Sequence, residues 1–455
     1  RREREIREFV KTPFYRVLLV QELSRKRFEG EWRAVEGSAY YQSPLLYKEN
    51  GFKKKEDAEE LIRRLKEISP AESKVVSVER KKETRYAPLL FNLAELQNEC
   101  SRRFKISPDE TLKITQELYE KKLVTYPRTD ARVLSSAVAK EIRKNLSGLG
   151  QYGPAAEYVR EILEKESYKS IGKSRYTNDK QITDHYAIIP TGQGLGALKS
   201  LSSVAGQVYE TIVRRFLAIF YPPAVYQKVA LTTQMGTEKF FANFRALQEE
   251  GYLKVTPNMN DKKKEKEEET GCDAAMLEAL MKLRKGAALP VKGAKIKEGE
   301  TSPPKRYNSG SMILAMENAG QLIEDEDLRS QIKGSGIGTS ATRAEILKKL
   351  VNNKYIALNK KTQIITPTLL GENIFDVVNV SIRSLLNPEL TASWEKGLTY
   401  VANGEITSDE YMQKLEHFVR SKTEQVLHSR QHFAMRPYFE AAAVYYNKKT
   451  TKKET

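Results

Sequence analysis

Alternation of apolar and polar residues marks candidate strands in two separate parts of the chain. A period of two is the pattern of a strand that buries one face. The strand-like segments are 16–23, 40–48, 74–80, 225–235, 239–247 and 252–256. A helical pattern at 55–68 interrupts the first group. Because strands, helices, strands and helices follow in that order, we expect the second β-rich part to complete a domain that the first begins.

Helical spacing of apolar residues dominates the remaining chain. It begins at 93–104, and a second helix is predicted from Ser107, where an N-cap serine precedes Pro108 and Glu110. That helix runs to about residue 121 and leads into a short basic loop. Further helices are expected at 1–6, 136–146, 208–219 and over most of the chain from Ser309 onward. Two helices around a basic loop favour a winged-helix-like domain.

Composition narrows the class of partner. The 455 residues include 77 Lys+Arg and 60 Asp+Glu, a formal net charge of +17. Such an excess favours a polyanion, most commonly nucleic acid, although a basic protein without such a partner is the alternative. With 2 cysteines the chain can build neither a disulfide framework nor a four-thiolate zinc site. No apolar run approaches the ~20 residues of a membrane span, so we expect a cytoplasmic, nucleoid-associated protein without a membrane partner.

The segment 123–130, LVTYPRTD, holds the strongest candidate chemistry. Pro127 restricts Tyr126 to extended conformations, and residues two apart in an extended segment lie on one side. Tyr126 and Arg128 can therefore address one anion together. A tyrosine is a poor nucleophile at neutral pH unless a nearby cation favours its anion, and a guanidinium can also grip a phosphate. With 23 tyrosines in the chain, a buried loop tyrosine is the alternative for this pair alone.

Two other segments could contact phosphates. His185 follows an aspartate, and an imidazole held in either protonation state can donate to a phosphate oxygen. A glycine-rich turn at 334–343 leads into a helix, with Thr339 or Ser340 expected as N-cap and Arg343 on the first turn. It is neither a Walker loop nor a dinucleotide fingerprint. The four successive acids at 324–327 are interpreted as a solvated face, and no metal ligands are predicted in this chain.

Taken together, these segments resemble the type IA DNA topoisomerases, and most closely the topoisomerase III branch. The resemblance rests on ordered matches that extend to about residue 425. They are REREI at 2–6, FNL at 91–93, LQ at 96–97, LYE at 118–120, TYPRTD at 125–130, HYAIIPT at 185–191, TSPPKRY at 301–307, GIGTSATRA at 336–344 and PELTASWE at 388–395.

The resemblance implies a multidomain α+β fold: a toroid with a β-rich arch, a winged-helix-like tyrosine domain and a helical domain. The expected parts are a helical stub at 1–12, the arch at 13–88 and 206–300, the tyrosine domain at 89–205, a helical DNA-binding domain at 301–435 and a polar tail at 436–455.

It also implies an activity and a set of site residues. Tyr126 would attack a phosphodiester of single-stranded DNA and form a 5′-phosphotyrosine link, without ATP, to relax negative supercoils or decatenate DNA. Arg128 would hold the scissile phosphate. The residues expected on neighbouring phosphates are His185, Thr191, Gly338, Thr339, Ser340 and Arg343. The protein would act as a monomer, and a helicase partner is left open.

One departure from the family pattern concerns the metal. The family's toprim domain carries the Mg²⁺ ligands and a catalytic glutamate, and it would precede Arg1. We therefore expect the chain by itself to bind single-stranded DNA without cleaving it. Ser340 stands where many relatives have proline, and the cysteine count excludes zinc-ribbon tails.

Two other functions stay open. The chain could serve as a non-catalytic single-stranded DNA-binding module. A tyrosine recombinase also uses Tyr, His and Arg, but that family places its tyrosine last, whereas here the order is Tyr126, His185, Arg343.

Overall fold

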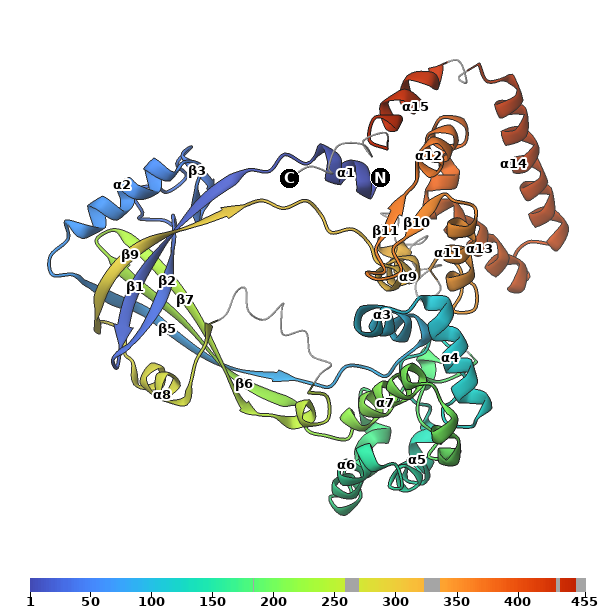
Figure 1. The fold of residues 1–455 in the computed structure, drawn as a ribbon, viewed down its shortest axis with the longest axis horizontal. Helices are drawn as coiled ribbons and strands as arrows, with labels where there is room; N and C mark the ends of the chain where they lie inside the picture. Colours follow the sequence, from blue (N-terminus) through green and yellow to red (C-terminus); the bar gives the residue numbers. More distant parts are fainter. Residues whose placement is uncertain (183, 258–269, 323–335, 431–433, 447–455) are drawn as a thin grey trace, which may run out of the picture. The chain divides into compact units, whose positions relative to one another are not determined.

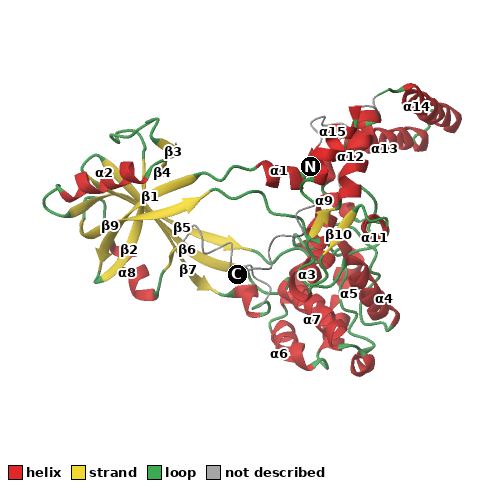
Figure 2. Cartoon of the chain, turned by 45° about the horizontal axis from the view of Figure 1, so that its top comes forward, coloured by secondary structure: helices red, strands yellow, loops and turns green. Residues whose placement is uncertain are grey.

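The computed structural model describes residues 1–182, 184–257, 270–322, 336–430 and 434–446 (Figure 1). The chain divides into two compact units, each made of two stretches of sequence. The first comprises Arg1–Pro88 and Ala218–Pro304, and the second Leu89–Leu217 and Lys305–Thr455. Figure 2 shows that strands dominate the first unit and helices the second. None of the described helices is both long and apolar enough to cross a membrane.

A nine-stranded sheet forms the centre of the first unit in the described part of the chain. Its strands are β1 (Pro13–Leu23), β2 (Lys26–Arg33), β3 (Leu46–Lys48), β4 (Gly51–Phe52), β5 (Glu72–Arg85), β6 (Ala224–Met235), β7 (Glu238–Glu249), β8 (Thr270–Gly271) and β9 (Ala288–Glu300). The strand order is β2-β7-β6-β5-β9-β1-β4-β3, and β1 also pairs with β2. Six antiparallel strands therefore close a circuit, which leaves them no open edge among themselves. Both β-rich parts of the sequence contribute to this sheet.

Three α-helices and one 3₁₀ helix are described in this unit: α1 (Arg2–Glu8), α2 (Lys55–Lys66), α8 (Ala274–Lys282) and η4 (Gly251–Lys254). Leu61 and Leu65 of α2 are buried in a core with Trp32 and Phe52, whose rings stack at 4.8 Å. The Trp32 Nε1 donates to a Glu238 carboxylate oxygen at 2.6 Å, so the buried indole N–H has its partner.

The second unit is mainly helical. Its α-helices are α3 (Leu93–Phe104), α4 (Pro108–Glu120), α5 (Ser136–Leu149), α6 (Gly153–Glu164), α7 (Ser203–Ala218), α9 (Ser309–Glu317), α11 (Arg343–Asn352), α12 (Leu369–Ser381), α13 (Pro388–Ala402), α14 (Ser408–His428) and α15 (Arg436–Ala443). Shorter elements are η1 (Ser167–Lys173), η2 (Asp179–Gln181), η3 (Leu195–Ser200), η5 (Ala319–Leu322), η6 (Arg383–Leu386) and the strand pair β10 (Ile356–Leu358) and β11 (Ile365–Pro367).

Helices α3 and α9 pack closely, and this contact later positions the candidate site. A Cβ added to Gly310 of α9 would lie 2.6 Å from the Asn98 Cα of α3, so only glycine allows this approach. The hydroxyls of Ser101 and Ser309 are hydrogen-bonded at 3.0 Å across the same contact. Ala94 and Ile313 are buried together in the core beside it.

The helix start at Ser107 is confirmed, because its side chain accepts from the Glu110 N–H and Pro108 stands in the first turn. The predicted strand at 252–256 is wrong. Gly251, with φ +52, begins the 3₁₀ helix η4 there, and the buried Tyr252 and Leu253 give it the apolar pattern of a strand. Most of the predicted strand at 40–48 is also wrong.

At 40–48 the chain forms turns before β3, and Tyr40 is buried because it packs edge-on against Trp32. Several described elements have no counterpart among the expected segments, and the longer ones are β2, β9, α6 and α8. The charged run at 261–269, the four acids at 324–327 and the end of the tail from 447 lie outside the described residues.

Candidate active site

Tyr126 lies in a loop that leaves the end of α4. The helix ends at Glu120, and Lys122 takes a left-handed conformation with φ +60 that reverses the chain. Leu123 and Val124 then enter the core with at most 1% of their surface exposed. These two buried residues anchor the start of the loop in the core. Tyr126, two residues after Val124, is half-buried.

The segment 187–191 supports the loop through backbone pairing. Val124 forms a β-bridge with Pro190, and the Thr125 N–H donates to the Ile189 carbonyl at 3.0 Å. The Thr125 hydroxyl donates to the Ala187 carbonyl at 3.1 Å and accepts from the Ile189 N–H at 3.0 Å. Two sequence segments about sixty residues apart therefore lie side by side at Tyr126.

This pairing brings the His185 imidazole to Tyr126. The two ring centroids are 4.4 Å apart, and the Tyr119 ring meets Tyr126 edge-on at 5.5 Å. His185 is exposed, whereas its backbone carbonyl accepts from the Thr129 hydroxyl at 2.8 Å. A phenol and an exposed imidazole thus share one small surface, and the loop itself fixes the histidine backbone.

Arg128 is exposed and lines an open pocket of about 450 Å³ between α4 and the start of α11. The residues around the pocket are Asp109, Leu112, Lys113, Gln116, Glu117, Glu120, Arg128, Ala341, Ala344 and Glu345. The glycine-rich turn and the tyrosine loop therefore meet at one depression in this unit.

The glycine-rich turn packs on the end of α9. Gly336 and Gly338 have φ +63 and +67, and a Cβ on Gly336 would lie 2.3 Å from the Met316 carbonyl oxygen. The expected N-cap is wrong: α11 begins after Thr342, whose hydroxyl instead accepts from the Thr339 N–H at 2.9 Å. The Thr339 and Thr342 hydroxyls also lie 3.3 Å apart, so hydrogen bonds between these two residues close the turn.

Arg343 was expected on a phosphate, but its side chain is only 1% exposed. Its Nη1 donates to Asp130 Oδ1 at 2.9 Å, and its Nε donates to the Ile337 carbonyl at 3.3 Å. The Asp130 side chain is 33% exposed, so the ion pair is buried on the arginine side only. In the structure Arg343 therefore joins α11 and the turn before it to the tyrosine loop.

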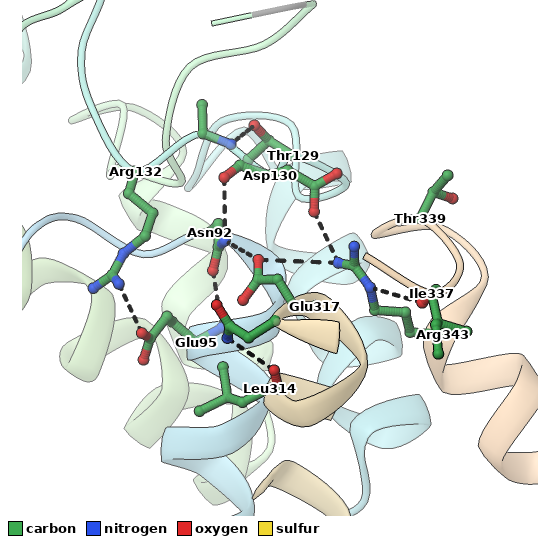
Figure 3. A network of polar contacts seen from close by, with 12 residues as sticks. Asn92, Glu95, Thr129, Asp130, Arg132, Leu314, Glu317, Ile337, Thr339 and Arg343 are labelled. Atoms are coloured by element: carbon green, nitrogen blue, oxygen red, sulfur yellow. Dashed lines mark hydrogen bonds and ion pairs between the residues drawn. The ribbon is translucent and has the colours of Figure 1, made fainter. Parts of the chain in front are cut away.

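The pair of Arg343 and Asp130 belongs to a larger buried network (Figure 3). Glu317 Oε1, at the end of α9, lies 4.0 Å from Arg343 Nη1 and accepts from Asn92 Nδ2 at 2.7 Å. Asn92 Nδ2 also donates to the Asp130 carbonyl at 3.1 Å. Burial raises the pKa of the Glu317 carboxyl above its ordinary value of 4.5, while Arg343 and the hydrogen bond from Asn92 act in the opposite direction.

Thr191 lies beside the loop rather than facing the pocket residues. Its hydroxyl donates to the Lys122 carbonyl, and it accepts from the Gln193 N–H at 3.0 Å. The structure thus brings Tyr126 together with His185. Arg128 lines the same pocket as Ala341, which follows Ser340 in the sequence. Thr191 is hydrogen-bonded to the turn at Lys122.

Sequence reasoning missed Asn92, Asp130 and Glu317 as members of the site. An asparagine before an apolar helix does signal an N-cap, and Asn92 is one, because its Oδ1 accepts from the Glu95 N–H at 2.9 Å. Nothing in the pattern around Glu317 points to its partners, which come from three other segments of the chain.

A metal site would need several His, Cys, Asp or Glu side chains that converge on one point. The described residues contain no group of three or more His, Cys, Asp or Glu side chains that could hold a metal ion. The carboxylates of Glu317 and Asp130 accept hydrogen bonds from Asn92 and Arg343, respectively. The described part of the chain therefore does not fit a Mg²⁺ site.

Comparison with known proteins gives consistent matches. The family model described as DNA topoisomerase matches residues 1–413. DNA topoisomerase 3 of Bacillus licheniformis is 34% identical over 363 residues, which are 79% of this chain and 48% of that protein. DNA topoisomerase 3 of Bacillus subtilis is 34% identical over 375 residues, 82% of this chain and 49% of that protein. The chain thus spans about half the length of the curated relatives that it matches.

Among solved structures, full-length topoisomerase I from Thermotoga maritima aligns with a TM-score of 0.64 at 24% identity, over 93% of this chain and 61% of that one. This likeness concerns the fold. It confirms the expected fold class, in which a large antiparallel sheet is combined with many helices.

Proposed function

Because this chain belongs to the type IA DNA topoisomerase family and is topoisomerase III-like, we propose that it breaks and rejoins one strand of DNA through Tyr126. The protein would thereby relax negative supercoils or decatenate DNA, and an activity on DNA would place it at the nucleoid. The observation that carries the proposal is the ring contact of 4.4 Å between Tyr126 and His185, on the loop that also presents Arg128.

In the proposed reaction the Tyr126 oxygen attacks the phosphorus of a single-stranded DNA phosphodiester. The bond from phosphorus to the 3′-oxygen breaks, and a 5′-phosphotyrosine forms. The tyrosine proton leaves as the new bond forms, and the departing 3′-oxygen takes up a proton. Resealing is the reverse exchange. One phosphodiester replaces another, so no nucleotide hydrolysis is needed.

The surrounding residues support specific roles in that exchange. Arg128 is exposed on the pocket rim and carries a fork of donors suited to the scissile phosphate. The exposed His185 can donate to an adjacent phosphate oxygen. We further propose that the backbone of Gly338, Thr339 and Ser340 borders the path of the strand. Thr191 contributes by closing the turn that supports the loop.

Mg²⁺ is the cofactor that family membership suggests, and it would relieve charge on the departing 3′-oxygen. The described residues supply no ligand set for it. In our proposal a toprim domain binds the ion, and this chain spans about half the length of the relatives that it matches. The chain's own part is to supply the nucleophile and to hold the strand.

Tyr126→Phe tests the assignment, because it removes the nucleophile and no positive charge. The wild-type chain and the variant, each supplied with a toprim domain by fusion or in trans, are incubated with a labelled single-stranded oligonucleotide and Mg²⁺ and stopped with SDS. We expect a covalent adduct, linked to the 5′ side of the break, from the wild type alone. Oligonucleotide affinity should be nearly equal for the two proteins.

Three other outcomes would change the proposal. An adduct from Tyr126→Phe would show that another residue is the nucleophile. A 3′-linked adduct would point to recombinase chemistry instead. Binding without any adduct from the wild type would favour a non-catalytic single-stranded DNA-binding module.

A further inference from the structure

The tyrosine loop is held at its far end by Asp130. The Asp130 carboxylate accepts from Arg343 at 2.9 Å, and its backbone carbonyl accepts from Asn92 at 3.1 Å. One residue of the loop is thus bound twice, once by α11 and once by the residue that caps α3. Neither partner lies next to it in the sequence.

Glu317 connects these two partners. Its Oε1 accepts from Asn92 at 2.7 Å and lies 4.0 Å from the Arg343 guanidinium (Figure 3). The Glu317 side chain is 14% exposed and Arg343 is 1% exposed. Ionic groups that are so well shielded from water interact strongly and tolerate the loss of a partner poorly. The carboxylate is therefore hydrogen-bonded to Asn92 and within ion-pair distance of Arg343, the two groups that bind Asp130.

The position of Asp130 is transmitted to Tyr126 through a tight turn. The Thr129 N–H donates to the Pro127 carbonyl at 3.0 Å, and the Thr129 carbonyl accepts from the Leu93 N–H at 3.1 Å. The Thr129 hydroxyl binds the His185 carbonyl at 2.8 Å. A shift at Asp130 would therefore move the backbone on which Tyr126 stands and also the backbone of His185.

We propose that Asn92 and Glu317 are positioning residues for Tyr126, which hold the tyrosine loop against α9 and α11 through Asp130 and Arg343. This inference rests on the proposed function of Tyr126. Neither residue faces the pocket beside Arg128, so neither is expected to bind DNA. Their loss should lower the rate of strand cleavage while leaving DNA affinity in place.

Asn92→Asp is the sharpest test, because aspartate is as good an N-cap as asparagine. The cap to Glu95 would remain, but both amide donors would be replaced by an acceptor that faces Glu317 and the Asp130 carbonyl. Glu317→Ala removes the carboxylate that contacts both Asn92 and Arg343, whereas Glu317→Gln keeps an acceptor for Asn92. Glu99→Ala is the matched control: Glu99 is a buried carboxylate of α3, paired with Arg102 at 2.9 Å.

The chain is supplied with a toprim domain and a saturating single-stranded oligonucleotide, and the single-turnover rate of adduct formation and the Kd are measured. We expect Asn92→Asp and Glu317→Ala to slow cleavage about 10- to 100-fold, as when a reacting group is misplaced by about 1 Å. The Kd should change less than about threefold, which is within ~0.7 kcal/mol. Glu317→Gln should slow cleavage less than Glu317→Ala, and Glu99→Ala should stay near the wild type.

A pH series separates positioning from a general loss of structure. The charged groups facing Glu317 are Asp130 from the loop, Arg343 from α11 and Glu95 from α3. In Asn92→Asp the introduced carboxyl adjoins Glu317, and two such carboxyls share a proton as the pH falls. A protonated carboxyl can donate again, so the relative cleavage rate of Asn92→Asp should recover as the pH falls. Glu317→Ala should show no such recovery.

Hydrogen exchange provides a readout that does not depend on activity. In the chain alone, the amides of Thr129 and Ala131 should exchange faster in Asn92→Asp and Glu317→Ala than in the wild type or Glu99→Ala. Wild-type cleavage rates in Asn92→Asp and Glu317→Ala would overturn the inference, as would a Kd that rises in step with the fall in rate. If the wild type forms no adduct, the proposed function fails, and unchanged exchange would then refute the positioning role as well.

Discussion

Glu317 illustrates how a side chain that joins a local polar network can still reduce stability at neutral pH. Burial raises the pKa of its carboxyl above the ordinary value of 4.5. The folded protein therefore keeps this proton to a higher pH than the unfolded chain does. A contribution of this kind is fully present below the ordinary pKa and is lost as the pH rises through the folded value.

Glu317→Gln removes this titration, since an amide has no proton to lose in that range. We expect the wild type to lose stability relative to Glu317→Gln as the pH rises above about 4.5, the ordinary value. Urea unfolding midpoints, measured at several pH values from about 4 to 8, provide the check. Midpoints that differ by a constant amount over the whole range would contradict the raised pKa.

At the scale of elements, the support of the tyrosine loop depends on how closely α5 approaches the segment after Pro190. A Cβ on Gly148 would lie 2.2 Å from the Gly192 carbonyl oxygen, and Gly192 itself has φ +77. The Asn145 Nδ2 donates to the Pro190 carbonyl at 3.0 Å in the same contact. Glycine at 148 therefore allows the helix backbone to touch the segment that pairs with Thr125.

Gly148→Ala should separate α5 from this segment and destabilise the protein by about 1–3 kcal/mol, the usual cost of overpacking. Gly206→Ala is the matched control, because Gly206 lies in α7 and its added Cβ would meet nothing within 4 Å. That change should be neutral or stabilising by about 0.5–1 kcal/mol, since alanine is the better helix former. The free energy of unfolding of both variants is measured by denaturant unfolding. Equal changes in Gly148→Ala and Gly206→Ala would refute the close contact between α5 and the segment after Pro190.

At the scale of the whole molecule, the net charge of +17 is the property most relevant to a DNA partner. Cationic side chains that contact phosphates release counterions, so affinity falls steeply with salt. We expect the affinity for a single-stranded oligonucleotide to drop about tenfold or more between about 50 and 200 mM salt, and duplex DNA to bind more weakly. Fluorescence anisotropy across that range provides the measurement.

Arg128→Ala should weaken binding and reduce the slope of log affinity against log salt by about one. Arg63→Ala removes the same charge from α2, where the guanidinium is paired with Glu60 and Glu67, and should leave the slope unchanged. A flat salt response, or equal slopes for all three proteins, would argue against phosphate binding at Arg128.

Local sequence signals were sufficient for several elements. Ser107, Pro108 and Glu110 predicted the start of α4 because a cap, a proline and a first-turn acid act within one turn. The same locality drew attention to Tyr126 and Arg128, whose joint action on one anion stays a prediction. It failed at 252–256, where a buried 3₁₀ turn has the same short apolar pattern as a strand.

The sequence by itself determined the family, the loop that carries Tyr126 and most of the long helices, because those signals lie within a few neighbouring residues. Only the tertiary structure decided that Arg343 is buried on Asp130, that Glu317 joins Asn92 to it, and that β1 pairs with both β2 and β9. Each of these depends on residues brought together from distant parts of the chain. Burial and partner choice are properties of packing, and no local pattern encodes them.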